Sequence, residues 1–209
     1  MRTKKIYVVR HGQTDYNLKG VVQGSGIDAP INSTGKMQAE AFYENFKGIP
    51  LDHIYYSGLI RTRQSIAKFL NSEISEEKLV DLNEISWGNY EGLPMDHREN
   101  QYYLDMLVRW SSGELSHKID GGESPIEVAK RLKRAFLHIL ETGGENILVC
   151  MHGRAIRILM TILLGYDLRY MDAFRHENLC CYVLEEKNDG IIYLDSYHPS
   201  PSISKDAID

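Results

Sequence analysis

The chain has 209 residues, of which 43% are hydrophobic and 25% are charged, as in ordinary globular proteins. Its formal net charge of −5, from 24 basic and 29 acidic residues, excludes the broadly basic surface of a nucleic-acid-binding protein. An anionic ligand must therefore be attracted by a local cluster of positive groups. The three cysteines match neither a disulfide framework nor a metal site, and Cys180 and Cys181 are expected to pack in the core.

No apolar run approaches the roughly 18 residues that a membrane-spanning helix needs, and no apolar secretory segment precedes the first predicted strand. We therefore expect a cytoplasmic protein that does not bind a membrane. The length suits a single domain over residues 1–209. Neither the composition nor the charge indicates an oligomeric state.

Stretches rich in β-branched and aromatic residues predict strands at residues 6–9, 53–56, 147–151, 180–185 and 191–195. Helical patterns lie between them. Asn32 is placed to cap a helix that ends near Gly48, and Ser57 to cap a second that runs through Leu70. Ser124 and Glu127 form a capping-box pattern that begins a third helix, which stops before residue 143, and a fourth spans about 154–164.

Strands that alternate with helices predict an α/β fold, here a three-layer sandwich with a mostly parallel central sheet flanked by helices. Residues 89–122 break this alternation and predict a small, mainly helical insertion that forms a lid. The terminal stretch 198–209 is rich in serine and proline and poor in apolar residues, so it is expected to be loose on the surface.

Two of the apolar strands end in the same polar pattern. The first runs into Arg10-His11-Gly12, and the third, residues 147–151, runs into His152-Gly153. Because ligands of open parallel sheets bind at the carboxyl ends of the strands, these residues are expected to share one site. The glycines allow close backbone approach, and the helix N-termini that follow them favour an anion.

Six segments, in order along nearly the whole chain, resemble the histidine phosphatase superfamily in its phosphoglycerate mutase-like branch. The first two are RHGQTDYN, similar to R-H-G-x-T-x-x-N, and QGSGIDAPINSTGKMQA, which carries one extra residue relative to the family pattern. The others are YYSGLIRTRQSIA, LNEISWGNYEG, GGES and VCMHG. R-H-G alone is common, but the ordered set is specific.

The resemblance implies that His11 is the nucleophile and forms a phosphohistidine intermediate. For that role, the attacking nitrogen must be unprotonated while the other donates to a backbone carbonyl. Positive and polar groups would surround the phosphoryl group and stabilise its charge. The resemblance assigns this role to Arg10, Arg61, His152, Asn17, Gln23, Gly24 and Gly153. Glu84 would donate a proton to the leaving oxygen and then activate water.

The same resemblance implies a metal-independent enzyme with no cofactor that acts on a small phosphomonoester. Two histidines at strand ends could suggest zinc, but adjacent arginines would repel a divalent cation. His53, His97, His117, His138, His176 and His198 match no catalytic motif and are read as surface or structural residues.

Two other functions stay open. One is a cofactor-dependent phosphoglycerate mutase, although the insertion lacks the tyrosine-glycine opening, the lysine and the paired arginines that mutases of this family carry. The other is a phosphate-binding module without catalysis, which His11 and Glu84 argue against. Arg154 replaces a small or apolar residue; it could add positive charge near the rim of the pocket or face solvent, and solvent is the favoured interpretation. Residues of the insertion that could line the substrate site are Tyr90, His97, Arg98, Tyr102, Tyr103 and Arg109.

Overall fold

A computed structural model describes residues 3–70, 73–93, 97–142, 144–187 and 190–203. Its centre is a six-stranded sheet with the order β3-β2-β4-β1-β5-β6. The strands are β1 (Lys4–Arg10), β2 (His53–Tyr56), β3 (Ser75–Lys78), β4 (Asn146–Met151), β5 (Cys181–Glu186) and β6 (Ile192–His198). Neighbouring strands from β3 to β1 pair in parallel, whereas β5 is antiparallel to both β1 and β6. The sheet is mostly parallel, as predicted.

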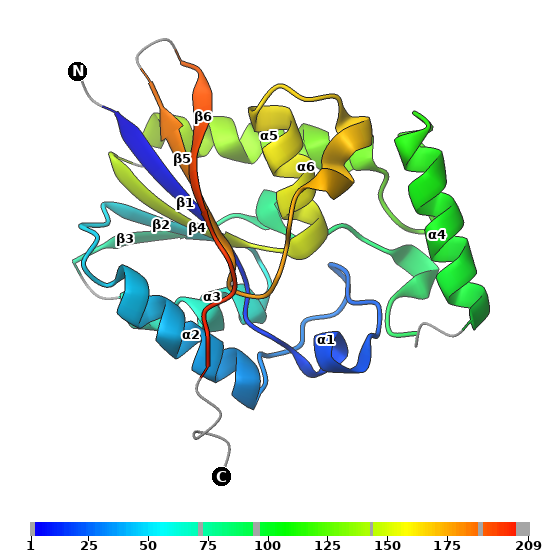
Figure 1. Ribbon diagram of the computed structural model, residues 1–209, viewed down its shortest axis with the longest axis horizontal. Coiled ribbons are helices and arrows are strands. Elements are labelled where there is room, and N and C mark those ends of the chain that lie inside the picture. Colours follow the sequence, from blue (N-terminus) through cyan, green and yellow to red (C-terminus); the bar gives the residue numbers. More distant parts are fainter. Residues whose placement is uncertain (1–2, 71–72, 94–96, 143, 188–189, 204–209) are drawn as a thin grey trace.

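Helices cover both faces of this sheet, which gives the three predicted layers. α5 (Pro125–Thr142) and α6 (Gly153–Leu163) lie on one face, and α2 (Ser33–Phe46) and α3 (Ile60–Ser65) lie on the other (Figure 1). The short α1 (Asp15–Lys19) follows β1, and α4 (His97–Ser111) stands at one end of the molecule (Figure 1). Over the described residues, no helix combines the length and apolar character required to cross a bilayer.

Alternation along the strands divides the core into two clusters. In β1, Ile6 and Val8 belong to the cluster under α5 and α6, whereas Tyr7 and Val9 belong to the cluster against α2. A central strand buried on both faces has to be apolar at every position, which explains its continuous hydrophobic run. The three cysteines are free and buried, as expected, and burial raises the pKa of the Cys180 thiol to about 12.

Two predicted helix starts are confirmed. The Asn32 side chain accepts from the Gly35 N–H at 2.8 Å and caps α2. Ser124 and Glu127 form the reciprocal capping box of α5: the Ser124 N–H donates to Glu127 Oε2 at 2.8 Å, and the Glu127 N–H donates to Ser124 Oγ at 3.3 Å. Both signals are local, so they can be read without knowledge of the tertiary structure.

The prediction for the Ser57 helix is wrong. α3 begins at Ile60, its cap residue Leu59 makes no side-chain cap bond, and the helix ends at Ser65 before a short 3₁₀ turn. Ser57 instead bonds to His152, as described below. The polar edge strand β3 was not predicted, because its sequence Ser-Glu-Glu-Lys carries no hydrophobic signal.

The predicted insertion contains α4, which is anchored to the main core. Met106 and Trp110 are buried in the same cluster as α5 and α6, and Trp110 Nε1 donates to the His117 carbonyl at 2.8 Å. At the other end of the chain, β6 extends to His198, which we had expected to begin the loose tail. Residues 204–209 of that tail lie outside the described residues.

Candidate active site

The carboxyl ends of β1 and β4 bring the two predicted histidines together. In this parallel pair, Val9 is in register with Cys150 and Arg10 with Met151. His11 and His152 therefore leave the sheet side by side, and their ring centroids are 5.1 Å apart. The His11 N–H still donates to the Met151 carbonyl at 3.0 Å, which holds the first histidine at the strand end.

His11 has the tautomer that a nucleophile needs. It is 3% exposed, and its Nδ1 lies 2.7 Å from the Gly12 carbonyl oxygen. Since a carbonyl can only accept, Nδ1 carries the proton and Nε2 keeps a free lone pair. Burial, together with the positive charges of Arg10 and Arg61, holds the pKa of His11 well below its usual range. The imidazole is therefore neutral at neutral pH.

Arg61 is fully buried beside the histidines and is fixed by three hydrogen bonds. Its Nε donates to His152 Nδ1 at 3.3 Å, and its two terminal nitrogens donate to the carbonyls of Ile27 at 2.7 Å and Gly24 at 3.1 Å. Burial lowers the pKa of Arg61 to about 10, so the guanidinium stays charged at neutral pH. The loop after α1 is thus tied to the site through one buried cation.

Two buried donors next to His11 have no acceptor. Arg10 Nη1 donates to the His176 carbonyl, but Arg10 Nε has no hydrogen-bond partner among the described residues. Gln23 Oε1 accepts from the Thr14 hydroxyl at 2.8 Å, whereas Gln23 Nε2 is buried without a partner in the same described set. A buried unpaired donor costs roughly 1–3 kcal/mol, so two at one site indicate a ligand with acceptor oxygens.

Asn17 and Asn178 form a small amide network at the rim. Asn17 Oδ1 accepts from the Thr14 N–H and from Asn178 Nδ2, each at 3.2 Å. Asn178 Nδ2 also donates to the His11 carbonyl at 3.0 Å. Because its oxygen is used internally, Asn17 can present its own N–H groups to a ligand.

Leu179, which follows Asn178, has a φ of 57°, a left-handed conformation that costs a branched residue about 1–2 kcal/mol.

Glu84 is 7% exposed, and its carboxylate caps the N-terminus of α6. It accepts from the N–H groups of Ile85 at 2.9 Å, Arg154 at 3.0 Å and Ala155 at 2.9 Å. Arg131 on α5 holds the backbone here, donating to the Glu84 carbonyl at 3.1 Å. The carboxylate is thus fixed where its charge reaches both Arg10 and Arg61, and it favours their protonated forms.

His152 lies beside His11 with both of its nitrogens engaged by the protein. Nδ1 accepts from Arg61 Nε, and Nε2 lies 2.7 Å from the Ser57 hydroxyl oxygen. Burial and the charge of Arg61 hold the pKa of His152 well below its usual range, so it is neutral. Because Nδ1 of the neutral ring accepts from Arg61, Nε2 carries the proton and donates to the Ser57 hydroxyl oxygen.

The two glycines that we expected near the phosphate are required by close approach. A Cβ on Gly153 would lie 2.9 Å from His176 Cδ2 and 3.2 Å from Arg10 Nε. A Cβ on Gly24 would lie 2.7 Å from the backbone carbonyl oxygen of Ile85. Glycine after the second histidine therefore lets the Arg10 guanidinium pass over the start of α6.

Arg10, Asn17, Gln23 and Asn178 of this site line a cavity of about 380 Å³. Aromatic side chains and amides form much of its wall, and it is lined among others by Arg10, Tyr16, Trp87, Tyr103, His176 and Asn178. Tyr103 is the one member of our insertion set that lines it among the described side chains. Tyr102 stacks on Tyr90 at 5.1 Å, and Arg109 pairs with Glu114 at 2.5 Å. The side chains of His97 and Arg98 lie outside the described residues.

One expectation is corrected here. Arg154 does not face solvent: it is 5% exposed and bonds to Asp172 and Tyr103. His176, which we read as surface or structural, lines the cavity, and its backbone carbonyl accepts from Arg10. Sequence reasoning also missed Ser57, Asn178 and Arg131. Ser57 stands in the YYSGLIRTRQSIA segment but was read as a helix cap, and Asn178 lies in no quoted motif. Arg131 also lies in no quoted motif, but in the structure it pairs at 2.8 Å with Glu123 of the GGES segment.

Among solved structures, a mycobacterial glucosyl-3-phosphoglycerate phosphatase has a TM-score of 0.80 and 22% sequence identity, covering 96% of this chain and 100% of that one. Among curated proteins, the provisionally named phosphoserine phosphatase 2 of Hydrogenobacter thermophilus is 26% identical over 92% of this chain and 95% of its own. The provisionally named phosphoglycerate mutase GpmB of Yersinia enterocolitica is 30% identical over 77% of this chain and 75% of its own.

The sequence profile of the histidine phosphatase superfamily (branch 1) matches residues 6–197. This range contains both strand-end histidines, the buried arginine and the capping glutamate. The chain therefore belongs to the histidine phosphatase superfamily.

Proposed function

We propose that this protein is a metal-independent phosphatase that hydrolyses a small phosphomonoester through a phosphohistidine on His11. The observation that carries the proposal is the state of His11: Nδ1 is bonded to the Gly12 carbonyl, the ring is neutral, and unpaired donors lie beside it. A neutral imidazole with a directed lone pair is a nucleophile, and unpaired donors suit the oxygens of a phosphoryl group.

In the first step, the Nε2 lone pair of His11 attacks phosphorus and the bond to the leaving oxygen breaks. Protonated Glu84 gives its proton to that oxygen, so the product leaves as an alcohol. The positive charges of Arg10 and Arg61 stabilise the equatorial oxygens of the phosphoryl group. Arg10 Nε and Gln23 Nε2 donate hydrogen bonds to these oxygens.

In the second step, Glu84 takes a proton from water as the water oxygen attacks phosphorus. The nitrogen–phosphorus bond breaks, its electron pair returns to His11, and inorganic phosphate leaves with Glu84 protonated again. Glu84 suits both roles because one carboxyl group is held at one place by the N–H groups of α6. The positive charge comes from arginines, so no step calls for a metal.

The proposal is tested by incubating the purified protein with p-nitrophenyl phosphate, with and without EDTA. We expect equal hydrolysis in both, and acid-labile phosphate bound to the wild-type protein. Loss of activity in EDTA that zinc or magnesium restores would overturn metal independence. No hydrolysis, with phosphate bound reversibly, would favour the binding module.

The mutase alternative is tested by measuring the interconversion of 2- and 3-phosphoglycerate. We include this test because the Yersinia relative is named as a phosphoglycerate mutase. A mutase must return the phosphoryl group to its substrate faster than water intercepts it. We expect release of inorganic phosphate to exceed exchange, because the insertion lacks the lysine and paired arginines of the mutase pattern.

A further inference from the structure

Arg131, in the second turn of α5, makes five hydrogen bonds around Glu84. Nη1 donates to the carbonyls of Asp81 and Asn83, both at 2.8 Å, and Nη2 donates to the Glu84 carbonyl at 3.1 Å. The other two bonds go to the carboxylate oxygens of Glu123, from Nε at 2.8 Å and from Nη2 at 2.9 Å. A guanidinium has five N–H groups, so these contacts engage its full donor capacity.

The segment that Arg131 holds is irregular. A short 3₁₀ turn spans Val80–Leu82, and residues 83–87 after it belong to no helix or strand. Carbonyls outside a helix or a sheet need donors from elsewhere when they are shielded from water. Arg131 supplies them from a helix whose Val128 and Leu132 are buried in the main core, and its own side chain is 13% exposed.

Glu123 holds the same segment on the other side of Glu84. Glu123 Oε2 accepts from the Ser86 N–H at 2.9 Å, and the Glu123 N–H donates to the Ser86 carbonyl at 2.9 Å. The next residue, Ser124, begins the capping box of α5, so Glu123 is anchored to the start of that helix. Glu84 therefore lies between two backbone positions that one bidentate ion pair fixes.

From these contacts we infer that Arg131 and Glu123 form a clamp that positions Glu84 as the acid for the leaving group. The inference rests on the proposed function, in which Glu84 is that acid. The carboxylate of Glu84 is held by the N-terminus of α6, and the clamp holds its backbone from α5. Proton transfer requires hydrogen-bond distance, and a displacement of about 1 Å can cost about a hundredfold in rate. Arg131 is thus a positioning residue that acts through Glu84.

Arg134, one turn further along α5, provides a matched control. Its Nε and Nη2 donate to the two carboxylate oxygens of Asp81, each at 2.9 Å. This pair also joins α5 to the segment before Glu84, but it binds a side chain, and the Arg134 side chain is 62% exposed. Because exposed ion pairs contribute little, its loss should leave Glu84 in place.

The test compares phenyl phosphate with p-nitrophenyl phosphate, which have similar shapes. Phenolate is the stronger base, so its departure depends more on a proton from Glu84. Arg131→Met, of similar length but without N–H groups, should lower kcat/KM for phenyl phosphate by roughly tenfold to a hundredfold. The loss for p-nitrophenyl phosphate should be less than about threefold. The ratio of the two values within one variant does not depend on the fraction of protein that is folded.

Three further variants complete the experiment. Arg134→Met should keep the wild-type ratio within about twofold. The double variant Glu84→Gln with Arg131→Met should match the ratio of Glu84→Gln within about threefold, because residues that act as one unit are not additive. If Arg131→Met does not fold, Arg131→Lys decides: it keeps the charge opposite Glu123 but has three donors in place of five, and it should lower the ratio by roughly threefold or more.

Folded Arg131 variants that keep the wild-type ratio, or that lose rate equally on both substrates, would overturn the inference while the phosphatase function stands. A double variant with a ratio well below that of Glu84→Gln would overturn it too, because Arg131 would then act without Glu84. An equal change of the ratio in Arg134→Met would show that the clamp has no specific role. Failure of the wild-type protein to hydrolyse p-nitrophenyl phosphate would instead overturn the proposed function itself, and the inference with it.

Discussion

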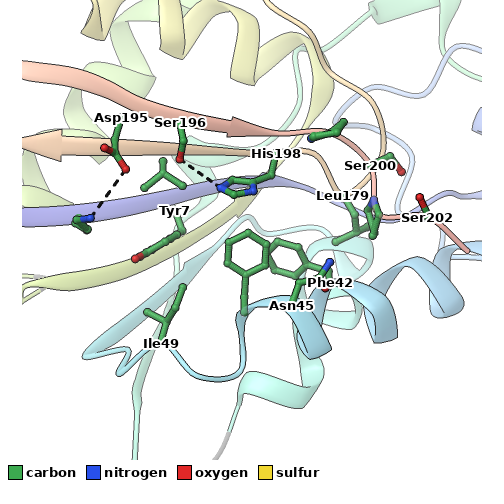
Figure 2. Close-up of a pocket in the computed structure, with 15 residues that line it drawn as sticks. Tyr7, Phe42, Asn45, Ile49, Leu179, Asp195, Ser196, His198, Ser200 and Ser202 are labelled. Atoms are coloured by element: carbon green, nitrogen blue, oxygen red, sulfur yellow. Dashed lines mark hydrogen bonds and ion pairs between the residues drawn. The ribbon is translucent and has the colours of Figure 1, made fainter.

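Two cavities of this protein differ in what their polar groups do. The larger, of about 510 Å³, lies between α2, the sheet and the segment after β6. Figure 2 shows two polar pairs in it: Lys5 with Asp195 at 3.9 Å, and Ser196 with His198 at 3.3 Å. Much of its wall is apolar, including Phe42, Leu179 and Ile49 (Figure 2).

The smaller cavity, of about 380 Å³, has the opposite character. Arg10 and Gln23 line it, and among the described residues their Nε and Nε2 atoms are buried without acceptors. The neutral His11 follows Arg10 directly in the chain. Unpaired donors cost stability unless a ligand completes them, whereas the polar pairs of the larger cavity are already complete. Volume alone would favour the larger cavity as the candidate site, whereas the unsatisfied donors favour the smaller one.

The largest effect should come from His11→Ala. We expect turnover to fall by roughly 10⁴-fold or more, as when a catalytic nucleophile is removed, and acid-labile phosphate to disappear from the protein. The variant should still unfold cooperatively, because the neutral ring makes its hydrogen bond to the adjacent Gly12 carbonyl and links no distant element. The readouts are kcat/KM and the thermal unfolding curve. A folded variant that keeps a substantial rate would refute the nucleophile assignment.

Glu84→Gln and Arg61→Met should separate proton donation to the leaving oxygen from charge stabilisation of the phosphoryl oxygens. If Glu84 protonates the leaving oxygen, its loss should slow alkyl phosphates by about 10²–10⁴-fold and nitrophenyl phosphate far less, since nitrophenolate needs no proton. Arg61→Met should slow both substrates alike, because Arg61 stabilises the phosphoryl oxygens.

The measurement is the ratio of kcat/KM for the two substrates within each variant. This ratio is independent of the fraction of protein that is folded, which matters because Glu84 also caps α6. Equal losses for Glu84→Gln on both substrates would exclude Glu84 as the acid.

The free energy of unfolding should decrease as the pH is lowered, because His11 and His152 are buried as neutral rings. Their pKa values are held well below the unfolded value of about 6.5, so below that pH the unfolded chain binds protons that the folded protein does not. Each ring should then cost up to about 1.4 kcal/mol per pH unit, whereas above about pH 7 neither contributes a slope.

Urea unfolding of the wild type and of His11→Gln, measured at about pH 5.5 and about pH 8, checks this expectation. Below about pH 6.5, the free energy of unfolding of the variant should fall less steeply with acid than that of the wild type, by about 1.4 kcal/mol per pH unit. At about pH 8 the free energy of unfolding of the variant should have reached its plateau, because neutral histidines contribute no slope there. An unchanged slope would mean that His11 is not held neutral by the fold.

The smallest effect should come from Asn45→Ala in the larger cavity. Asn45 is exposed near the end of α2, and alanine has the higher helix propensity, so stability should change by at most about 0.5 kcal/mol. Hydrolysis of p-nitrophenyl phosphate should stay within about twofold of wild type. A larger change in kcat/KM would show that the two cavities are coupled.

Much of the architecture could be predicted because its signals are local. Apolar runs identified β1, β2 and β4, capping residues identified the starts of α2 and α5, and histidine-glycine pairs identified the strand ends that carry the site. A parallel pairing of β1 with β4 then places His11 beside His152 without further information. The polar strand β3 was missed because its place is set by pairing with β2 and not by its own composition.

What the sequence by itself determined is the set of candidate catalytic groups, since each of these residues lies within a short motif. Only the tertiary structure decided which other residues line the cavity beside them. Tyr103 and His176 line it from α4 and the segment before β5, Arg154 of α6 contacts Tyr103, and no spacing along the chain relates the three residues. Arg154 illustrates the reason: an isolated arginine is normally solvated, and it is buried here because Asp172, Tyr103 and Trp110 converge on it.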